Sequence, residues 1–312
     1  MMKIVLIIPF FGKFRPDFKY WLKSVEYNST IDFLLITDQS VEVPNNVRII
    51  KSTFKSFVNR VQQFYQFPIA LNNPYKICDF KPAFGEIFQN EIKCYDFWGH
   101  CDTDLIFGDI RHFISDEILT NYDRILANGH LTLYRNTQVT NAMYKKAIPS
   151  FKEVFSSNDN YAFDEAGRGN GTTLYWYRNL KHKFYINREI FDDIFTLKDN
   201  FVPTNYSIEN RRNFIYSFDN GILFRFYEIN GTVKKEETLY VHFQKRKLFV
   251  PSIVQNRFTI IPNKIITYIE TPNIDFLRKN AKDKFFNKQF FKIKTKYVKS
   301  KIKKLLKETF ST

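Results

Sequence analysis

Short apolar runs rich in β-branched residues alternate with amphipathic segments along the first part of the chain. The runs predict buried strands, and the segments with apolar positions three or four residues apart predict helices. Strands are expected at 2–9, 31–37 and 47–50, and helices at 18–28 and 53–65. The resulting order β-α-β-β-α is typical of the opening of an open α/β sheet.

The same alternation continues through the middle of the chain. A helix is predicted at 79–92, entered through Lys81-Pro82 with the proline in its first turn. Further helices are expected at 108–119 and 141–155, the second broken near Pro149. Further strands are expected at 95–100, 124–127, 130–134, 183–186, 222–227 and 237–243. Residues 156–172 ("SSNDNYAFDEAGRGNGT") lack periodicity and predict a long loop, a type of segment that often carries function.

The end of the chain differs from the rest in both pattern and charge. Residues 276–310 have an apolar stripe at helical spacing with lysine on the other faces. Residues 276–312 hold thirteen Lys and Arg against two acidic residues, which is +11 of the chain's net charge of +15. We therefore expect a catalytic or binding domain at 1–270 and a basic amphipathic helical tail at 271–312.

Three partners suit such a tail. Its charge could bind nucleic acid or anionic lipid headgroups, and its apolar stripe favours the membrane surface. The alternative is a helix packed on the body of the protein or on a partner. Since no apolar run reaches 18 residues and "MMKIVLIIPF" is unlike a signal peptide, the expected location is the cytoplasm, at the inner face of the membrane.

The hydrophobic content and the cysteines indicate a globular protein without disulfide bonds. A chain of 312 residues that is 44% hydrophobic can bury a sizeable core. The three cysteines, Cys78, Cys94 and Cys101, have spacings that fit neither a disulfide framework nor a zinc site, and we expect reduced thiols.

Aspartates follow two of the predicted strands. Asp38 ends the second strand, and Asp102 and Asp104 end the apolar run "YDFWGHC". Ligands of open α/β sheets bind beyond the carboxyl ends of the strands, and positions two apart in an extended chain point the same way. Such paired oxygens suit Mg²⁺ or Mn²⁺ bound together with substrate phosphates, and the alternative is an ordinary turn or cap pair. Asp109 is expected to start the next helix.

Several segments together carry a family resemblance. They are the loop "IPFFG" after the first strand, the helix segment "YKICDFKPAFG", the strand end "WGHCDTDLIFGD" and the late "YVHFQKRK". Over roughly residues 2–250 the chain resembles bacterial nucleotide-sugar glycosyltransferases of the GT-A fold that act in capsule and lipopolysaccharide biosynthesis. The resemblance implies a Rossmann-like, mixed central sheet flanked by helices. It also implies a nucleotide-sugar donor, more specifically a UDP-sugar, a growing surface glycan as acceptor, and Mn²⁺ or Mg²⁺ as cofactor.

The resemblance also implies roles for single residues. The metal ligands would be Asp102, Asp104 and His242. The donor-binding residues would be Pro9, Phe10, Phe11 and Gly12 along the nucleoside, Asp38 at the base or ribose, Lys81 and Asp102 at the diphosphate or sugar, and Lys245 and Arg246 at the leaving phosphates. Independently of the resemblance, the position of Asp79 two residues before Lys81 predicts that its carboxylate orients Lys81 or stabilises the start of the helix. Each residue also has an ordinary structural reading, as a cap, a surface lysine or a solvated basic turn.

A reaction that inverts the sugar's configuration needs a carboxylate to take the acceptor's proton. Asp164 and Glu165, in the loop "AFDEAGRGNG", are the candidates, although they could equally belong to an acidic surface loop. A retaining reaction needs no such base, and both outcomes stay open. The rival functions are a metal-dependent nucleotidyltransferase, which would release pyrophosphate, and a nucleic-acid-binding protein acting through the basic tail.

Overall fold

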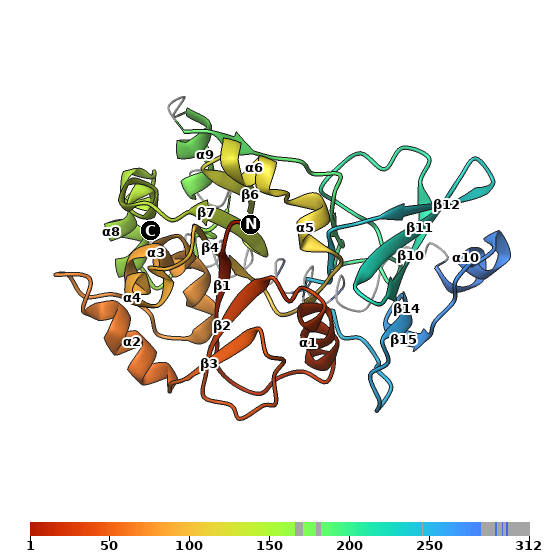
Figure 1. The fold of residues 1–312 in the computed structure, drawn as a ribbon, viewed down its shortest axis with the longest axis horizontal. Coiled ribbons are helices and arrows are strands. Elements are labelled where there is room, and N and C mark those ends of the chain that lie inside the picture. Colours follow the sequence, from red (N-terminus) through yellow and green to blue (C-terminus); the bar gives the residue numbers. More distant parts are fainter. Residues whose placement is uncertain are drawn as a thin grey trace, which may run out of the picture. The chain divides into compact units, whose positions relative to one another are not determined.

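The structure, a computed structural model, describes residues 1–165, 171–178, 182–244 and 246–281, together with 291, 295 and 298. The chain divides into two compact units (Figure 1). The N-terminal unit comprises Met1–Leu105 and Asp109–Arg188, and the C-terminal unit comprises Ile106–Gly108 and Glu189–Thr312. Each unit is described by itself below.

The N-terminal unit is built on a mixed sheet. Its strands are β1 (Ile4–Phe10), β2 (Ile31–Thr37), β3 (Val47–Lys51), β4 (Phe97–Cys101), β6 (Arg124–Asn128), β7 (Leu131–Arg135) and β8 (Phe184–Tyr185). They are arranged in the order β3-β2-β1-β4-β7-β6-β8. The first four run parallel, whereas β7 is antiparallel to both β4 and β6. The carboxyl ends of β1, β2 and β4 therefore lie at one edge of the sheet.

Short helices surround this sheet. They are α1 (Phe18–Glu26), α2 (Phe54–Gln62), the 3-10 helix η1 (Pro74–Ala83), α3 (Phe84–Ile87), α4 (Gln89–Ile92), α5 (Ile110–Phe113), α6 (Asp116–Asn121), α7 (Gln138–Asn141), the 3-10 helix η2 (Met143–Lys146), α8 (Phe151–Ser156) and α9 (Gly171–Arg178). Side chains cap several of them, as Asp109 does by accepting from two backbone N–H groups of α5. The expectation that Asp109 starts a helix is therefore confirmed.

Helices cover both faces of the sheet. On one face, buried residues of β1 and β2 pack with aromatic residues of α2, α3 and α8, such as Phe57, Phe84 and Phe155. On the other face lies α1, whose Trp21 ring meets Phe33 of β2 edge-on with 5.9 Å between the centroids. Figure 1 shows α2 and α3 on one side of β1 and β2, and α1 on the other. Burial on both faces explains why β1 and β2 read as continuous apolar runs.

The C-terminal unit contains two further sheets. A three-stranded sheet has the order β5-β13-β9, and a five-stranded antiparallel sheet has the order β12-β11-β10-β14-β15. The bounds are β5 (Leu105–Phe107), β9 (Asp192–Asp193), β10 (Arg212–Asp219), β11 (Ile222–Ile229), β12 (Thr232–Glu237), β13 (Tyr240–His242), β14 (Arg257–Ile261) and β15 (Lys264–Thr267). The helix α10 (Ile274–Asn280) packs on the larger sheet through Leu277.

The predicted fold class, α/β with a mixed central sheet flanked by helices, is confirmed. Several predicted helices have different bounds. The segment predicted as one helix at 79–92 is η1, α3 and α4, and it begins at Pro74, so Pro82 lies inside η1 rather than in the first turn. The predicted helix 108–119 is two helices, because Ser115 caps α6 at the break. Residues 141–155 also divide, with a cis peptide bond at Ile148-Pro149.

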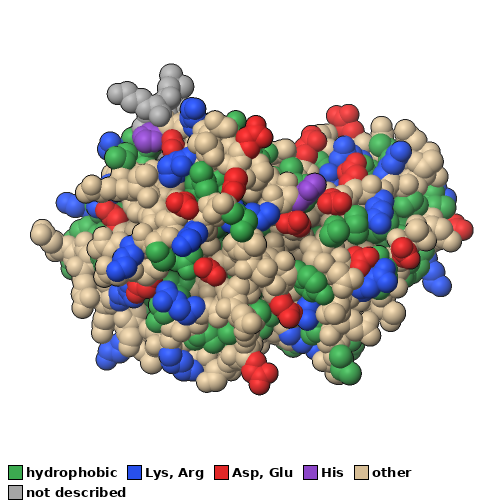
Figure 2. Space-filling model, in the orientation of Figure 1, with side chains coloured by type: hydrophobic (Ala, Val, Ile, Leu, Met, Phe, Trp, Pro, Cys, Tyr) green, Lys and Arg blue, Asp and Glu red, His purple; other side chains and the backbone are tan. Residues whose placement is uncertain are grey.

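The described residues show the surface of the molecule, the state of the cysteines and the start of the predicted tail. Acidic and basic side chains are interspersed on the face of the molecule in Figure 2. All three cysteines are free, as expected. No helix among the described residues is long and apolar enough to cross a membrane. Of the predicted tail helix, α10 is described, and most of residues 282–312 lie outside the described residues.

Candidate active site

Lys81 of η1 lies at the centre of a polar cluster within the N-terminal unit. Its Nζ donates to Oδ1 of Asp102 at 2.8 Å and to the carbonyl oxygen of Gly129 at 2.7 Å. It also forms an ion pair with Oδ2 of Asp164 at 3.1 Å. Asp102 directly follows β4, and Gly129 joins β6 to β7. The cluster thus combines one cation with two carboxylates at the carboxyl end of a central strand.

The two partners of Lys81 differ in exposure and therefore in electrostatics. The Asp164 side chain is 4% exposed, whereas that of Asp102 is 36% exposed. Burial raises the pKa of Asp164 to about 7, against the opposing effect of the Lys81 charge. Burial acts to lower the pKa of Lys81, but the Asp102 and Asp164 carboxylates outweigh it and raise this pKa above its usual value. Lys81 is thus held as a cation, while Asp164 can exchange a proton near neutral pH.

Gly129 is required by the close approach of Asp164. A Cβ atom built on Gly129 would lie 2.5 Å from Oδ2 of Asp164, far inside contact distance. The backbone N–H of Gly129 donates to Oε2 of Glu165 at 3.4 Å. The two predicted candidate bases, Asp164 and Glu165, therefore both contact the turn between β6 and β7. Nothing in the hydrophobic pattern singled out Gly129.

A second ion pair fixes the segment that carries Asp164. Nζ of Lys76 donates to Oδ2 of Asp79 at 2.7 Å and to the carbonyl oxygens of Val154 and Asp159. Asp79 also accepts from the backbone N–H groups of Tyr161 and Phe163. The expectation that Asp79 orients Lys81 or stabilises a helix start is wrong, because its carboxylate pairs with Lys76 and holds the chain just before Asp164.

Asp102 and Asp104 provide oxygens close together. Each offers a carboxylate oxygen, and these two atoms lie within 4.8 Å of one another. Both residues are partly exposed at the carboxyl edge of the sheet. Two hard oxygen donors at this separation suit a divalent cation such as Mg²⁺ or Mn²⁺, which usually takes its remaining ligands from water or substrate phosphate. The residues present therefore fit the predicted ion.

The loop after β1 lies at the same edge, next to Asp38. The backbone N–H of Gly12 donates to Oδ1 of Asp38 at 3.3 Å, and Gly12 has φ of +104°, a conformation that suits glycine. A hydrogen bond from Gln39 is the largest cause that lowers the pKa of Asp38. Beside this loop the Phe10 ring stacks on Phe14 with 4.5 Å between centroids. Of the other predicted residues here, Pro9 is half-buried within β1, one residue before its end, and Phe11 packs in the core.

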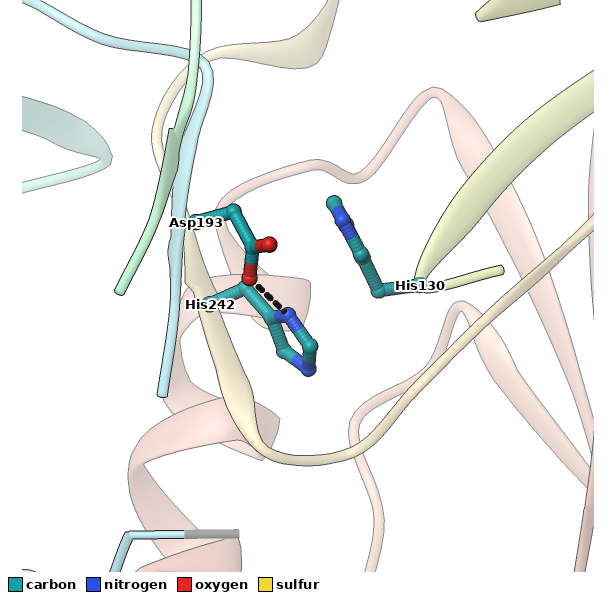
Figure 3. A group of neighbouring side chains, drawn as sticks. All are labelled: His130, Asp193 and His242. Carbon is teal, nitrogen blue, oxygen red and sulfur yellow. Dashed lines mark hydrogen bonds and ion pairs between the residues drawn. The ribbon is translucent and has the colours of Figure 1, made fainter. Parts of the chain in front are cut away.

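The remaining predicted site residues belong to the C-terminal unit. His242 ends β13, and its Nδ1 lies 2.8 Å from Oδ1 of Asp193 (Figure 3). Arg246 is buried, and its guanidinium donates to four backbone carbonyls at residues 195 and 198–200. Lys245 lies outside the described residues. The Arg246 guanidinium is therefore hydrogen-bonded to the protein's own backbone. Its predicted contact with phosphate stays a prediction.

Sequence reasoning missed two buried basic side chains beneath the cluster. His100 of β4 is fully buried, and burial followed by the charges of Lys81 and Arg124 lowers its pKa well below the usual value. Arg124 of β6 is also fully buried and lies over the Tyr134 ring at 5.2 Å. His100 lies within an apolar strand pattern and Arg124 at the start of one, and a polar residue in such a place is the signal that could have found them.

Comparison of the sequence with models of known protein families finds a match over most of the chain. Residues 6–269 match the family described as "Family of unknown function (DUF6625)". The chain belongs to this family. No curated protein matches the chain.

Several solved structures of other proteins are similar to this member of the family. Mouse xyloside xylosyltransferase 1 is 11% identical with a TM-score of 0.35, over 63% of this chain and 89% of that one. The galactosyltransferase LgtC is 11% identical with a TM-score of 0.34, over 62% and 76%. The glycosyltransferase GlyE of Streptococcus pneumoniae is 13% identical with a TM-score of 0.35, over 61% and 46%.

Proposed function

We propose that this protein is a metal-dependent glycosyltransferase that moves a sugar from a nucleotide-sugar donor to a hydroxyl of a glycan. The observation that carries the proposal is the position of Lys81 between Asp102 and the buried Asp164 at the carboxyl edge of the sheet. A diphosphate group brings negative charge to such an edge. A lysine held in its charged form, beside a carboxylate pair that can bind a cation, supplies the compensating charge.

Asp102 and Asp104 would hold Mn²⁺ or Mg²⁺, and His242 is proposed as a third ligand from the C-terminal unit. When bound, the ion neutralises charge on the donor's diphosphate. Lys81 donates to Oδ1 of Asp102 and so fixes the orientation of this carboxylate. Its ammonium group also adds positive charge where the leaving phosphate accumulates electrons. Lys245 and Arg246 are proposed to contribute further positive charge.

The nucleoside would bind along Pro9–Gly12, with Asp38 accepting from the base or ribose. The Phe10 and Phe14 rings provide an aromatic surface beside this loop, and bases stack readily on such rings. The bond between Gly12 and Asp38 fixes the backbone of the loop close to the carboxylate. UDP is the proposed nucleotide of the donor.

In the proposed reaction the acceptor oxygen forms a bond to the anomeric carbon of the sugar. The bond from that carbon to the diphosphate oxygen breaks, and its electron pair leaves with the nucleoside diphosphate. If configuration inverts, the hydroxyl proton passes to Glu165, which is only half-buried. If configuration is retained, that proton passes to the departing phosphate oxygen. Asp164 is buried against Lys81, and in this proposal it tunes the charge of the cluster.

The proposed acceptor is a growing surface glycan of a bacterium, of the capsule or lipopolysaccharide type. Such glycans are assembled at a membrane, and the thirteen basic residues of 276–312 would attract its anionic headgroups. The protein would then act at the inner face of the cytoplasmic membrane. Sedimentation with anionic vesicles should pull down the full chain but not a chain ending at residue 281, which keeps α10 packed on its sheet. Equal sedimentation of the two chains would contradict this part of the proposal.

A product assay tests the central proposal. The full chain is incubated with a panel of nucleotide sugars, with and without Mn²⁺, and the released nucleoside diphosphate is measured. We expect release that depends on Mn²⁺ and falls sharply in Asp104→Ala. Pyrophosphate release from a nucleoside triphosphate would instead indicate a nucleotidyltransferase, and full turnover of Asp104→Ala would disprove the metal assignment.

A further inference from the structure

The ring of His242 is held by a neighbouring strand within the C-terminal unit. β9 and β13 pair in parallel, and their register places Asp193 beside His242. The backbone N–H of Ile194 donates to the carbonyl oxygen of His242 at 3.0 Å, which fixes this register. The side chains then meet, with His242 Nδ1 2.8 Å from Asp193 Oδ1, as the dashed line in Figure 3 marks. The His242 side chain is only 9% exposed.

The Asp193 carboxylate is itself fixed from several directions. Its second oxygen, Oδ2, accepts from Nε2 of Gln244 at 2.7 Å. The backbone N–H of Asp193 donates to Oδ1 of Asn205 at 2.8 Å, and its carbonyl oxygen accepts from the backbone N–H of Thr204 at 2.9 Å. A carboxylate held at both oxygens and at its backbone has little freedom to rotate. The direction in which it presents Oδ1 to His242 is therefore set by the fold.

A carboxylate acceptor at Nδ1 decides which nitrogen of a neutral imidazole carries the proton. An ionised Asp193 carboxylate accepts hydrogen bonds and donates none, so the proton of a neutral His242 ring lies on Nδ1 and the lone pair on Nε2. A histidine that binds a metal through one nitrogen commonly donates from the other to a carboxylate, which orients the ring and increases its basicity. The His242–Asp193 pair has the carboxylate part of this arrangement. The hydrogen bond from Gln244 to the second oxygen of Asp193 comes from a residue of the motif "YVHFQKRK" itself.

We propose that Asp193 is a positioning residue that prepares His242 Nε2 to bind a divalent cation, with Gln244 fixing Asp193. This inference rests on the proposed function, since it gives His242 the ion held by Asp102 and Asp104. The inference goes beyond the proposed function because it assigns roles to Gln244 and to Asp193. Asp193 lies about 50 residues from the motif. A merely structural cross-strand bond would leave metal affinity unchanged when Asp193 is altered.

Metal affinity measured on the full chain tests the inference. Binding of Mn²⁺, alone and with UDP, is followed by electron paramagnetic resonance of the free ion. We expect Asp193→Ala to raise the Kd for Mn²⁺ about 10- to 100-fold, and Gln244→Ala to raise it less. Asp193→Asn should fall between wild type and Asp193→Ala, because its amide oxygen can still accept from Nδ1. Asp219→Asn removes another carboxylate of the same unit, one paired with Arg257, and should leave the Kd unchanged.

A second measurement reports on the ring itself. Nitrogen NMR of the metal-free protein should find the proton of His242 on Nδ1 in wild type and a shift toward Nε2 in Asp193→Ala. Thermal unfolding of each variant checks that it folds. If Asp193→Ala does not fold, the same measurements are made on Asp193→Asn, whose side chain has nearly the same shape.

The outcomes separate the inference from the proposed function. If wild type binds Mn²⁺ and Asp104→Ala weakens binding while folded Asp193 variants bind as wild type does, only the inference is overturned. If wild type binds no Mn²⁺ under either condition, the metal-dependent function fails and the inference fails with it. A His242 proton on Nε2 in the wild-type protein would also overturn the inference, whatever the metal affinity.

Discussion

Lys76 and Lys81 lie in the same 3-10 helix and each contacts a buried aspartate, but their surroundings differ. Lys76 and Asp79 are 2% and 0% exposed, and backbone groups of 154–163 complete their hydrogen bonds. Lys81 instead shares its charge between the buried Asp164 and the 36% exposed Asp102. The first pair is closed and holds the chain together. The second reaches solvent through Asp102, and a ligand can approach it there.

The largest expected effect is on stability, and it belongs to the closed pair. Lys76→Met leaves Asp79 buried without its cation and should lower the free energy of unfolding by about 3–5 kcal/mol. Lys81→Met should cost less, because Asp164 can take up a proton and Asp102 is partly solvated. Urea unfolding of both variants compares them directly, and an equal or larger loss in Lys81→Met would abolish the distinction between the two pairs.

The next effect is on activity, and it concerns Asp104, the proposed metal ligand beside Asp102. Asp104→Ala should lower the rate of nucleoside diphosphate release by about a hundredfold or more, because it removes a ligand that stabilises developing charge. Its free energy of unfolding should change little, since the side chain is partly exposed. Asp109→Asn is the matched control, because asparagine caps a helix as well as aspartate does. A comparable rate loss in this control would contradict a specific role for Asp104.

The contact between Gly129 and Asp164 provides a third comparison. Gly129→Ala places a methyl group 2.5 Å from Oδ2 of Asp164, and such overpacking typically costs about 1–3 kcal/mol. Combining it with Asp164→Ala removes the clash, so the two changes should be strongly non-additive. Additive losses in urea unfolding would show that the methyl group is accommodated elsewhere.

The last comparison is the pH dependence of the free energy of unfolding, to which Asp164 contributes a gradual change. Its pKa is raised to about 7 in the folded protein, against about 3.9 in an unfolded chain. Folded protein therefore binds more protons in this interval, and this stabilisation is lost as pH rises from about 4 to about 7, with a slope of at most about 1.4 kcal/mol per pH unit. Asp164→Asn should flatten this part of the curve. Identical slopes for the two proteins in urea unfolding would refute the assignment.

The apolar pattern predicted the buried elements of the N-terminal unit well. β2 spans Ile31–Thr37 as predicted, and α2 lies within the predicted 53–65 with Thr53 as its cap. These elements bury whole faces in one core, so their local pattern and their tertiary environment agree. Four strands of the five-stranded sheet in the C-terminal unit, β10, β12, β14 and β15, were not predicted, and for β12 ("TVKKEE") the reason is that the segment is largely polar. The Asn-Gly pairs at 220–221 and 230–231, all with positive φ, are the turn signals that could have found β10 and β12.

By itself the sequence determined the α/β class, the position of Asp102 and Asp104 at a strand end, and the "YVHFQKRK" segment that contains His242. These follow from local periodicity and from residues adjacent in the chain. Only the tertiary structure decided that Asp79 pairs with Lys76, that Lys81 contacts Asp164 and Gly129, and that Asp193 holds His242. The two contacts of Lys81 and the contact of Asp193 with His242 all join residues 48 or more positions apart. The fold selects such partners through burial and strand register, which the local pattern does not encode.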